Sequence, residues 1–165
     1  MKTHSCFGFY CAIFVTCIFG FGSAHSYELS GARWVISEGE SVSFQVSSVL
    51  SDDLSDAECL GAVQEGFDVW TDLTCSYMSW AYDGRTDNNR WGVGDGANIV
   101  SWRETNWQES SVVLAITSTI WGGGTNGYTD TDIKFNGDDH TWFTDTGGDR
   151  SGTDVISVAA HEVGH

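Results

Sequence analysis

The spacing of hydrophobic residues changes along the chain, and each change limits the secondary structure that can form. Residues 41–46 alternate between apolar and polar side chains, which is typical of a strand with one buried face. Residues 55–73 instead carry apolar side chains three or four positions apart and predict an amphipathic helix. Ser55 and Glu58 have the spacing of a capping box, which predicts that this helix starts there. The apolar residues of this helix are Leu60, Val63, Phe67 and Trp70.

Further strands and a last helix follow. Strand-favouring β-branched and aromatic residues are concentrated in residues 76–82, 98–102, 111–121 and 128–136. Loops and turns rich in glycine or aspartate are expected at residues 83–97, 122–127 and 137–153. Asp154 then stands at a helix N-cap position, with Val155, Val158 and Ala159 on one helical face. The order of these elements predicts an α+β or α/β domain with a central mixed sheet.

Residues 1–26 have the three-part layout of a secretory signal peptide. A lysine near the start precedes an apolar run over residues 6–22, and small residues follow it. The run is slightly shorter than the roughly 20 residues that span a bilayer, and no basic stop follows, which favours cleavage after Ala24 or Ser26 over a membrane anchor. We therefore expect a secreted protein, with a domain at residues 27–165 and no membrane contact after cleavage.

The chain that remains is strongly acidic. One lysine and no acidic residue leave with residues 1–26, so 23 acidic and 6 basic side chains remain and the net charge is near −17. Such a surface repels phosphate backbones, and we expect no nucleic-acid partner.

The loop before the last helix gathers carboxylates that suit calcium, which takes about 6–8 oxygen ligands. Ca²⁺ is therefore a candidate cofactor, and the alternative is that these are solvated loop side chains with Asp154 capping the helix. The residues concerned are Asp138, Asp139, Asp145, Asp149 and Asp154.

Two cysteines, Cys59 and Cys75, remain after residues 1–26 are removed. An even number of cysteines in an exported protein favours a disulfide. From Cys59 to Trp70 the helix rises about 16 Å, and five extended residues return roughly 16–18 Å. The bond therefore requires the chain to reverse promptly after Trp70 and to bring the two Cα atoms within about 7 Å.

The last residues, AAHEVGH at 159–165, carry the pattern H-E-x-x-H. On a helix, His161 and His165 project from one face a turn apart, so both imidazoles can bind one tetrahedral metal ion. Metal–nitrogen bonds of about 2.0–2.1 Å require the two nitrogens to lie roughly 3–4 Å apart. Glu162 can then take a proton from a water whose pKa zinc lowers to about 7. The other interpretation is an ordinary helix with two surface histidines, but two of the three histidines left after export fall at ligand spacing.

The segment VISVAAHEVGH resembles the active-site helix of the matrixin branch of the metzincin zinc endopeptidases. Upstream, AVQEGFDVWTDL is similar to the family's first helix, and NIVSWRETNW and LAITSTIW are similar to its central and edge strands. YTDTDIKFN is similar to the strand written Asp-Ala-Asp-Ile-x-Phe-Asn in many secreted matrixin-like proteases. These segments cover residues 42–165, and only the H-E-x-x-H segment is specific.

The resemblance implies an α+β fold, α/β-like and three-layered. A twisted five-stranded mixed sheet with one antiparallel edge strand would pack against the first helix and the active-site helix. Zn²⁺ would be held by His161 and His165, with Glu162 as the general base. We expect a monomeric zinc metalloendopeptidase whose peptide or protein substrate binds in extended form along the edge strand, at Ala115, Ile116, Thr117 and Ser118.

The family motif continues beyond the second histidine with a glycine, a third histidine and a methionine-containing turn. Because the sequence ends at His165, we interpret it as an N-terminal fragment of a longer protein, with the catalytic domain truncated at its C-terminal end. Animal matrixins also have a structural zinc held by several histidines and a prodomain cysteine that blocks the catalytic metal. Here His140 is the one spare histidine and no cysteine lies between residue 26 and the domain, so the resemblance is to the simpler secreted proteases.

Two alternatives remain open. One is a zinc protease of another clan, whose third ligand is a glutamate on a later helix. The other is a secreted, acidic, calcium-dependent binding module without catalysis, because eight tryptophans could serve such a surface. Trp70, Trp80 and Trp102 stand at predicted inward positions, whereas Trp91 and Trp107 lie in or near loops.

Overall fold

The computed structural model describes residues 32–122 and 127–165. The expected signal peptide at residues 1–26 and most of the expected turn at 122–127 lie outside the described residues. The described elements are, in chain order, β1 (Val42–Ser47), α1 (Asp56–Thr71), β2 (Trp80–Thr86), β3 (Ile99–Arg103), β4 (Ala115–Gly122), β5 (Gly127–Asn136), β6 (Trp142–Phe143), β7 (Thr153–Asp154) and α2 (Val155–Val163).

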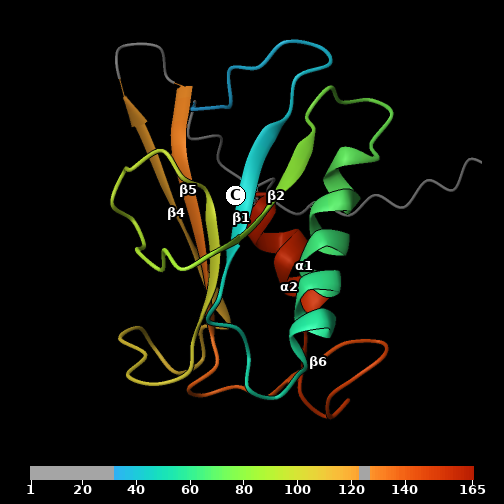
Figure 1. Cartoon of the computed structure of the whole chain (residues 1–165), viewed down its shortest axis with the longest axis vertical. Coiled ribbons are helices and arrows are strands. Elements are labelled where there is room, and N and C mark those ends of the chain that lie inside the picture. The colour runs from blue at the N-terminus through green and yellow to red at the C-terminus, as the bar shows by residue number, and fades with distance from the viewer. Residues whose placement is uncertain (1–31, 123–126) are drawn as a thin grey trace, which may run out of the picture. The chain divides into compact units, whose positions relative to one another are not determined.

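Five of the strands form one mixed sheet in the order β2-β1-β3-β5-β4 (Figure 1). β1 pairs in parallel with β2 and with β3, and β3 pairs in parallel with β5. β4 runs antiparallel to β5 and lies at the edge of the sheet. The expected mixed α+β class, with a five-stranded mixed sheet and an antiparallel edge strand, is therefore confirmed. The short parallel pair β6–β7 was not predicted and lies within and just after a segment expected to be a loop.

Helix α1 begins where the capping box predicts. The Ser55 hydroxyl accepts the N–H of Glu58 at 3.4 Å, and the Glu58 carboxylate accepts the N–H of Ser55 at 2.9 Å. These two bonds satisfy donors that the first helical turn would otherwise leave unpaired. Val63 and Phe67 are buried as expected, whereas Trp70 is 36% exposed. The predicted inner face is thus correct except at its last residue.

One face of the sheet carries the core, and both described helices pack on it. Val46 is paired in register with Val100, and Val100 with Ile133, so the three side chains lie on the same face. On α1, the ring of Phe67 stacks on Phe44 with the centroids 3.7 Å apart. Figure 1 shows α1 and α2 side by side. α2 adds Val155, Val158 and Ala159 to the same core.

The opposite face of the sheet is covered by a loop and not by a helix. Asp132 accepts the N–H groups of Gly92 at 2.7 Å and Ile99 at 3.0 Å, and Asp130 accepts the N–H of Gly96 at 2.8 Å. Gly92 and Gly96 have φ values of +65° and +80°, which glycine adopts without steric penalty. Helices and sheet therefore form two layers in the described part of the chain, and the third layer expected from the resemblance is a loop.

Strand β2 differs from its predicted position. The pattern predicted a strand at residues 76–82, but β2 begins at Trp80 and continues to Thr86 through residues expected to be a loop. Parallel pairing decides this, because Val42 is registered with Trp80 and Ser47 with Thr86. The position of β2 is thus determined by its backbone hydrogen bonds with β1 and not by the alternation of apolar residues.

The disulfide prediction is wrong in this structure, because Cys59 and Cys75 are both free. Cys59 is buried in the first turns of α1, while Cys75 is exposed beyond the other end of that helix. The chain first forms a turn, in which the Ser76 N–H bonds the Leu73 carbonyl at 3.1 Å. It runs back along α1 only with β2, whose Arg85 pairs with Asp56 at 2.8 Å, so Cys75 stays in the turn before this return. Burial raises the pKa of the Cys59 thiol to about 11, which keeps it protonated and unreactive.

None of the helices in the described ranges combines the length and the apolar character needed to cross a membrane.

We predict that α1 tolerates a methyl group at Gly61 but not at Gly66. A Cβ at Gly66 would lie 2.5 Å from the Cβ of Ala159, whereas nothing lies within 4 Å of a Cβ at Gly61. Gly66→Ala should lower the free energy of unfolding by about 1–3 kcal/mol through overpacking, and Gly61→Ala should raise it by roughly 0.5–1 kcal/mol. Urea titration of both variants measures this, and equal effects would contradict the close helix contact.

We also predict that Glu104 makes stability fall as pH rises. Burial raises the pKa of Glu104 from its ordinary value of 4.5 to about 7, assisted by a hydrogen bond with Asp52. A raised folded-state pKa means that the folded chain binds the proton more tightly, so this stabilisation is complete below pH 4.5 and is lost as pH rises through about 7. Thermal melting across that window should show a shallower fall for Glu104→Gln than for the wild type. Glu109→Gln, an exposed control, should follow the wild-type curve.

Candidate metal centre

Helix α2 begins and ends at residues that the sequence marks. The Asp154 carboxylate accepts the N–H of Ser157 at 2.9 Å and so caps the first turn. The helix runs to Val163, and Gly164 is its C-cap. His165 lies just past the helix, held by its N–H bond to the Glu162 carbonyl at 3.2 Å. The expected helix is confirmed as far as Val163, and the second histidine of the motif lies just beyond its C-cap.

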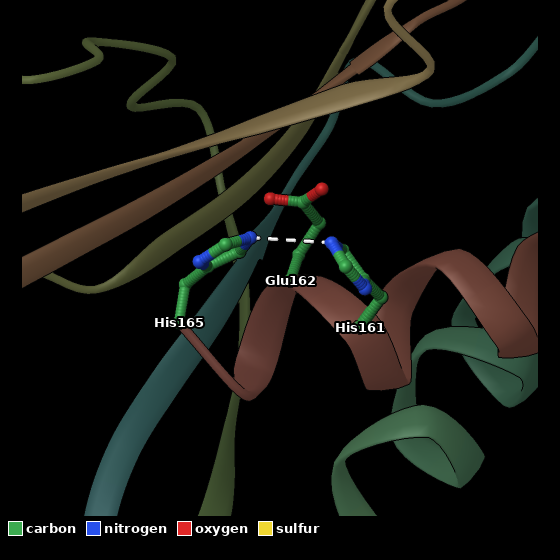
Figure 2. A group of neighbouring side chains, drawn as sticks. All are labelled: His161, Glu162 and His165. Carbon is green, nitrogen blue, oxygen red and sulfur yellow. Dashed lines mark hydrogen bonds between the residues drawn. The ribbon is translucent and has the colours of Figure 1, made fainter. Parts of the chain in front are cut away.

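The two histidine rings of the motif converge. Nε2 of His161 lies 3.2 Å from Nε2 of His165, and the ring planes are inclined at 83°. Figure 2 shows the rings facing each other from neighbouring turns, with the Glu162 carboxylate above the line between them. Two ligands of a tetrahedral ion with bonds of about 2.0–2.1 Å are roughly 3.3–3.4 Å apart. The predicted separation is therefore confirmed, and the side chains are placed to share one ion.

Glu162 stands between the histidines but in a different environment. It is 6% exposed, while His161 and His165 are exposed to solvent. One ligand atom from each of the three side chains lies within 4.8 Å of the others, and no other such group of three or more occurs in the described residues. Two imidazoles open to solvent beside a sheltered carboxylate are a donor set that could hold a metal ion.

The buried carboxylate has a partner on the edge strand that sequence reasoning did not find. The Thr117 hydroxyl of β4 lies 2.5 Å from Oε2 of Glu162 and 3.1 Å from the Glu162 carbonyl oxygen. Thr117 was expected only as a residue of the substrate strand. No sequence signal could have indicated this contact, because 45 positions separate the two residues.

Trp70 was also missed as a support of the site. Its indole N–H donates to the Ala160 carbonyl at 2.7 Å, next to His161. A Cβ at Gly164 would lie 2.7 Å from the same indole ring, so the motif's glycine makes room for it. Trp70 therefore packs against the end of α2 and is not part of the hydrophobic core.

The four residues expected to bind substrate all lie in the edge strand β4. The first residues of β4 are Ala115, Ile116, Thr117 and Ser118. β4 pairs with β5 on one side, and on its other side no strand of the described residues pairs with it. Thr117 is registered with Ile133, so its side chain faces the helices. Ser118 faces the other side of the sheet, where its hydroxyl lies 3.0 Å from the position of a Cβ at Gly92.

The aspartates expected to bind calcium are placed separately. Asp138 accepts the Trp107 N–H, and Asp139 is bonded to Asn136. Asp145 pairs with Arg150, and Asp149 accepts the Ser151 N–H, which lowers the pKa of Asp149. Asp154 caps α2. Because these carboxylates are not among the metal-ligand groups of the described residues, the structure adds no support for calcium, which stays a prediction.

Comparison with known proteins gives no assignment: no protein-family model matches the chain, and no curated protein matches it.

We predict that zinc affinity depends on His161 and His165 and not on His140. His161→Ala and His165→Ala should each weaken zinc binding by at least about 100-fold, since even the outer partners of metal ligands change affinity about 10–100-fold. His140→Ala is the control, because His140 is not part of the three-residue group. Competition with a chromophoric chelator measures the affinity, and circular dichroism checks that each variant is folded. Equal zinc affinity in all four proteins would contradict the site.

Proposed function

We propose that this protein is a secreted zinc-dependent endopeptidase of the matrixin-like kind. The observation that carries the proposal is the convergence of His161 and His165, with their Nε2 atoms 3.2 Å apart, beside the buried carboxylate of Glu162. The mixed sheet with its antiparallel edge strand next to α2 adds support, because an extended peptide needs a free strand edge close to the reacting groups.

Each group has a separate task in this proposal. His161 and His165 hold the metal, and Glu162 accepts the proton of the attacking water at its carboxylate and passes it to the leaving amine. Zinc, when bound, supplies Lewis acidity that lowers the pKa of water to about 7 and polarises the scissile carbonyl. β4 holds the substrate's main chain beside Glu162, because the side chain of Thr117 in β4 contacts the Glu162 carboxylate.

The proposal includes a third protein ligand of the metal, besides His161 and His165. Two imidazoles leave two positions of a tetrahedral ion, and catalytic zinc sites commonly use three protein ligands and one water. In a matrixin-like site the third ligand is a histidine six residues after His165. A glutamate from a later helix is the ligand expected in a zinc protease of another clan, so identification of this residue separates the two kinds of enzyme.

The packing of the tryptophans gives little support to the alternative function of a binding module. Trp102 stacks on Phe135 with centroids 4.3 Å apart, and Trp80 packs edge-on against Phe67 at 5.2 Å. Trp91 and Trp107, the two nearer to loops, both contact the Lys134 ammonium, which lies 4.0 Å and 5.3 Å from their ring centroids. These side chains pack within the protein, and a separate ligand is not needed to account for them.

We predict that Glu162→Gln abolishes hydrolysis without removing the metal. The amide cannot accept a proton, so kcat for a fluorogenic peptide should fall by about 10²–10⁴-fold, while zinc affinity stays close to that of the wild type. Glu65→Gln, at a glutamate on α1, is the matched control and should keep full activity. Activity that survives in Glu162→Gln, or that persists after zinc is stripped, would contradict the proposal.

A further inference from the structure

Thr117 connects the outer edge of the sheet with the active-site helix. Its side chain points to α2, because it shares a face with Ile133 and contacts Glu162. Its main chain belongs to the edge strand β4. One residue thus presents its hydroxyl to the carboxylate and its backbone to the side of the sheet where a further strand could pair.

The hydrogen bond from the Thr117 hydroxyl fixes one oxygen of the Glu162 carboxylate. An O–H···O⁻ distance of 2.5 Å, between Oγ1 of Thr117 and Oε2 of Glu162, is that of a charge-assisted bond. The hydroxyl has a single proton, and the longer contact of 3.1 Å to the Glu162 carbonyl oxygen leaves that proton on the carboxylate bond. No bond to Oε1 is made within the described residues, so this oxygen can receive a proton. Threonine is β-branched and stiff at χ1, which holds the hydroxyl in place.

The backbone direction follows from the antiparallel ladder. The Asn136 N–H donates to the Leu114 carbonyl at 2.9 Å, which makes Leu114 and Asn136 a hydrogen-bonded pair. Such pairs alternate along an antiparallel ladder, so Ile116 and Ser118 bond to β5 while Ala115 and Thr117 direct their N–H and C=O groups outward. An extended peptide added to this edge would therefore bond the backbone of Thr117.

We infer that Thr117 is a positioning residue that couples the peptide-binding edge of β4 to the Glu162 carboxylate. A peptide paired with the Thr117 backbone is held at a fixed distance from the oxygen that receives the proton, because one residue contacts both. The inference rests on the proposed hydrolytic function and adds to it the residue that orients the base. It also gives a role to the hydroxyl itself, which neither backbone pairing nor metal binding requires.

The first test removes the hydroxyl and keeps the shape. Thr117→Val should lower kcat for a fluorogenic peptide by about tenfold or more, since small misplacements of a catalytic group have effects of this size, while KM stays within about twofold. Thr117→Ser retains the hydroxyl and should recover most of kcat. Zinc affinity, measured by chelator competition, should be equal in all variants because Thr117 does not bind the metal. Thr131→Val is the control: the same change one strand away, at a buried hydroxyl without a hydrogen-bond partner.

The second test does not depend on catalysis. Thermal melting of Thr117→Val, Glu162→Ala and the double variant forms a double-mutant cycle. Thr117→Val should lower Tm when Glu162 is present and change it little when Glu162 is absent. Strictly additive shifts, or a Thr117→Val enzyme with wild-type kcat, would overturn the inference and leave the proposed function standing. A wild-type protein that shows the coupling but no zinc-dependent hydrolysis would instead overturn the proposed function, and the catalytic role of Thr117 with it.

Discussion

Helix α2 reaches the edge of the sheet because it lies against α1 with almost no space between the backbones. Gly66 provides this closeness, since any Cβ there would meet Ala159. Farther along, Trp70 bonds the Ala160 carbonyl and packs on Gly164. Both contacts lie on the side of α2 that faces α1, so the helix is fixed in position and in rotation. That placement sets the directions in which the side chains of His161, Glu162 and His165 point.

The rotation of α2 gives the three polar side chains of the motif different surroundings within little more than one helical turn. His161 and His165 are exposed and face each other, whereas Glu162 turns toward β4 and is buried. A buried carboxylate needs hydrogen-bond donors, and Thr117 supplies one. The same geometry thus leaves the imidazoles open to an ion from solvent and keeps the carboxylate in one orientation beside them.

The acidity of the chain has a structural part that composition does not reveal. Asp130 and Asp132 are fully buried, and the backbone N–H groups of Gly92 and Gly96 in the loop and of Ile99 at the start of β3 bond their carboxylates. Burial nevertheless raises the pKa of Asp132 to about 6. These aspartates fasten a loop rich in glycine to the back of the sheet, and most of the remaining acidic residues lie at the surface, where they give the protein its net charge.

The sequence by itself determined the features that depend on neighbouring residues. The capping box at Ser55, the buried face of β1, the N-cap at Asp154 and the convergence of two histidines four positions apart all follow from local backbone geometry. Only the tertiary structure decided the start of β2, the separation of Cys59 from Cys75, and the partners of Trp70 and Glu162. Trp70 and Ala160 are 90 positions apart, and Thr117 and Glu162 are 45 apart. Spacing along a chain fixes which side chains share a face of one element, but which elements meet depends on how the whole core packs.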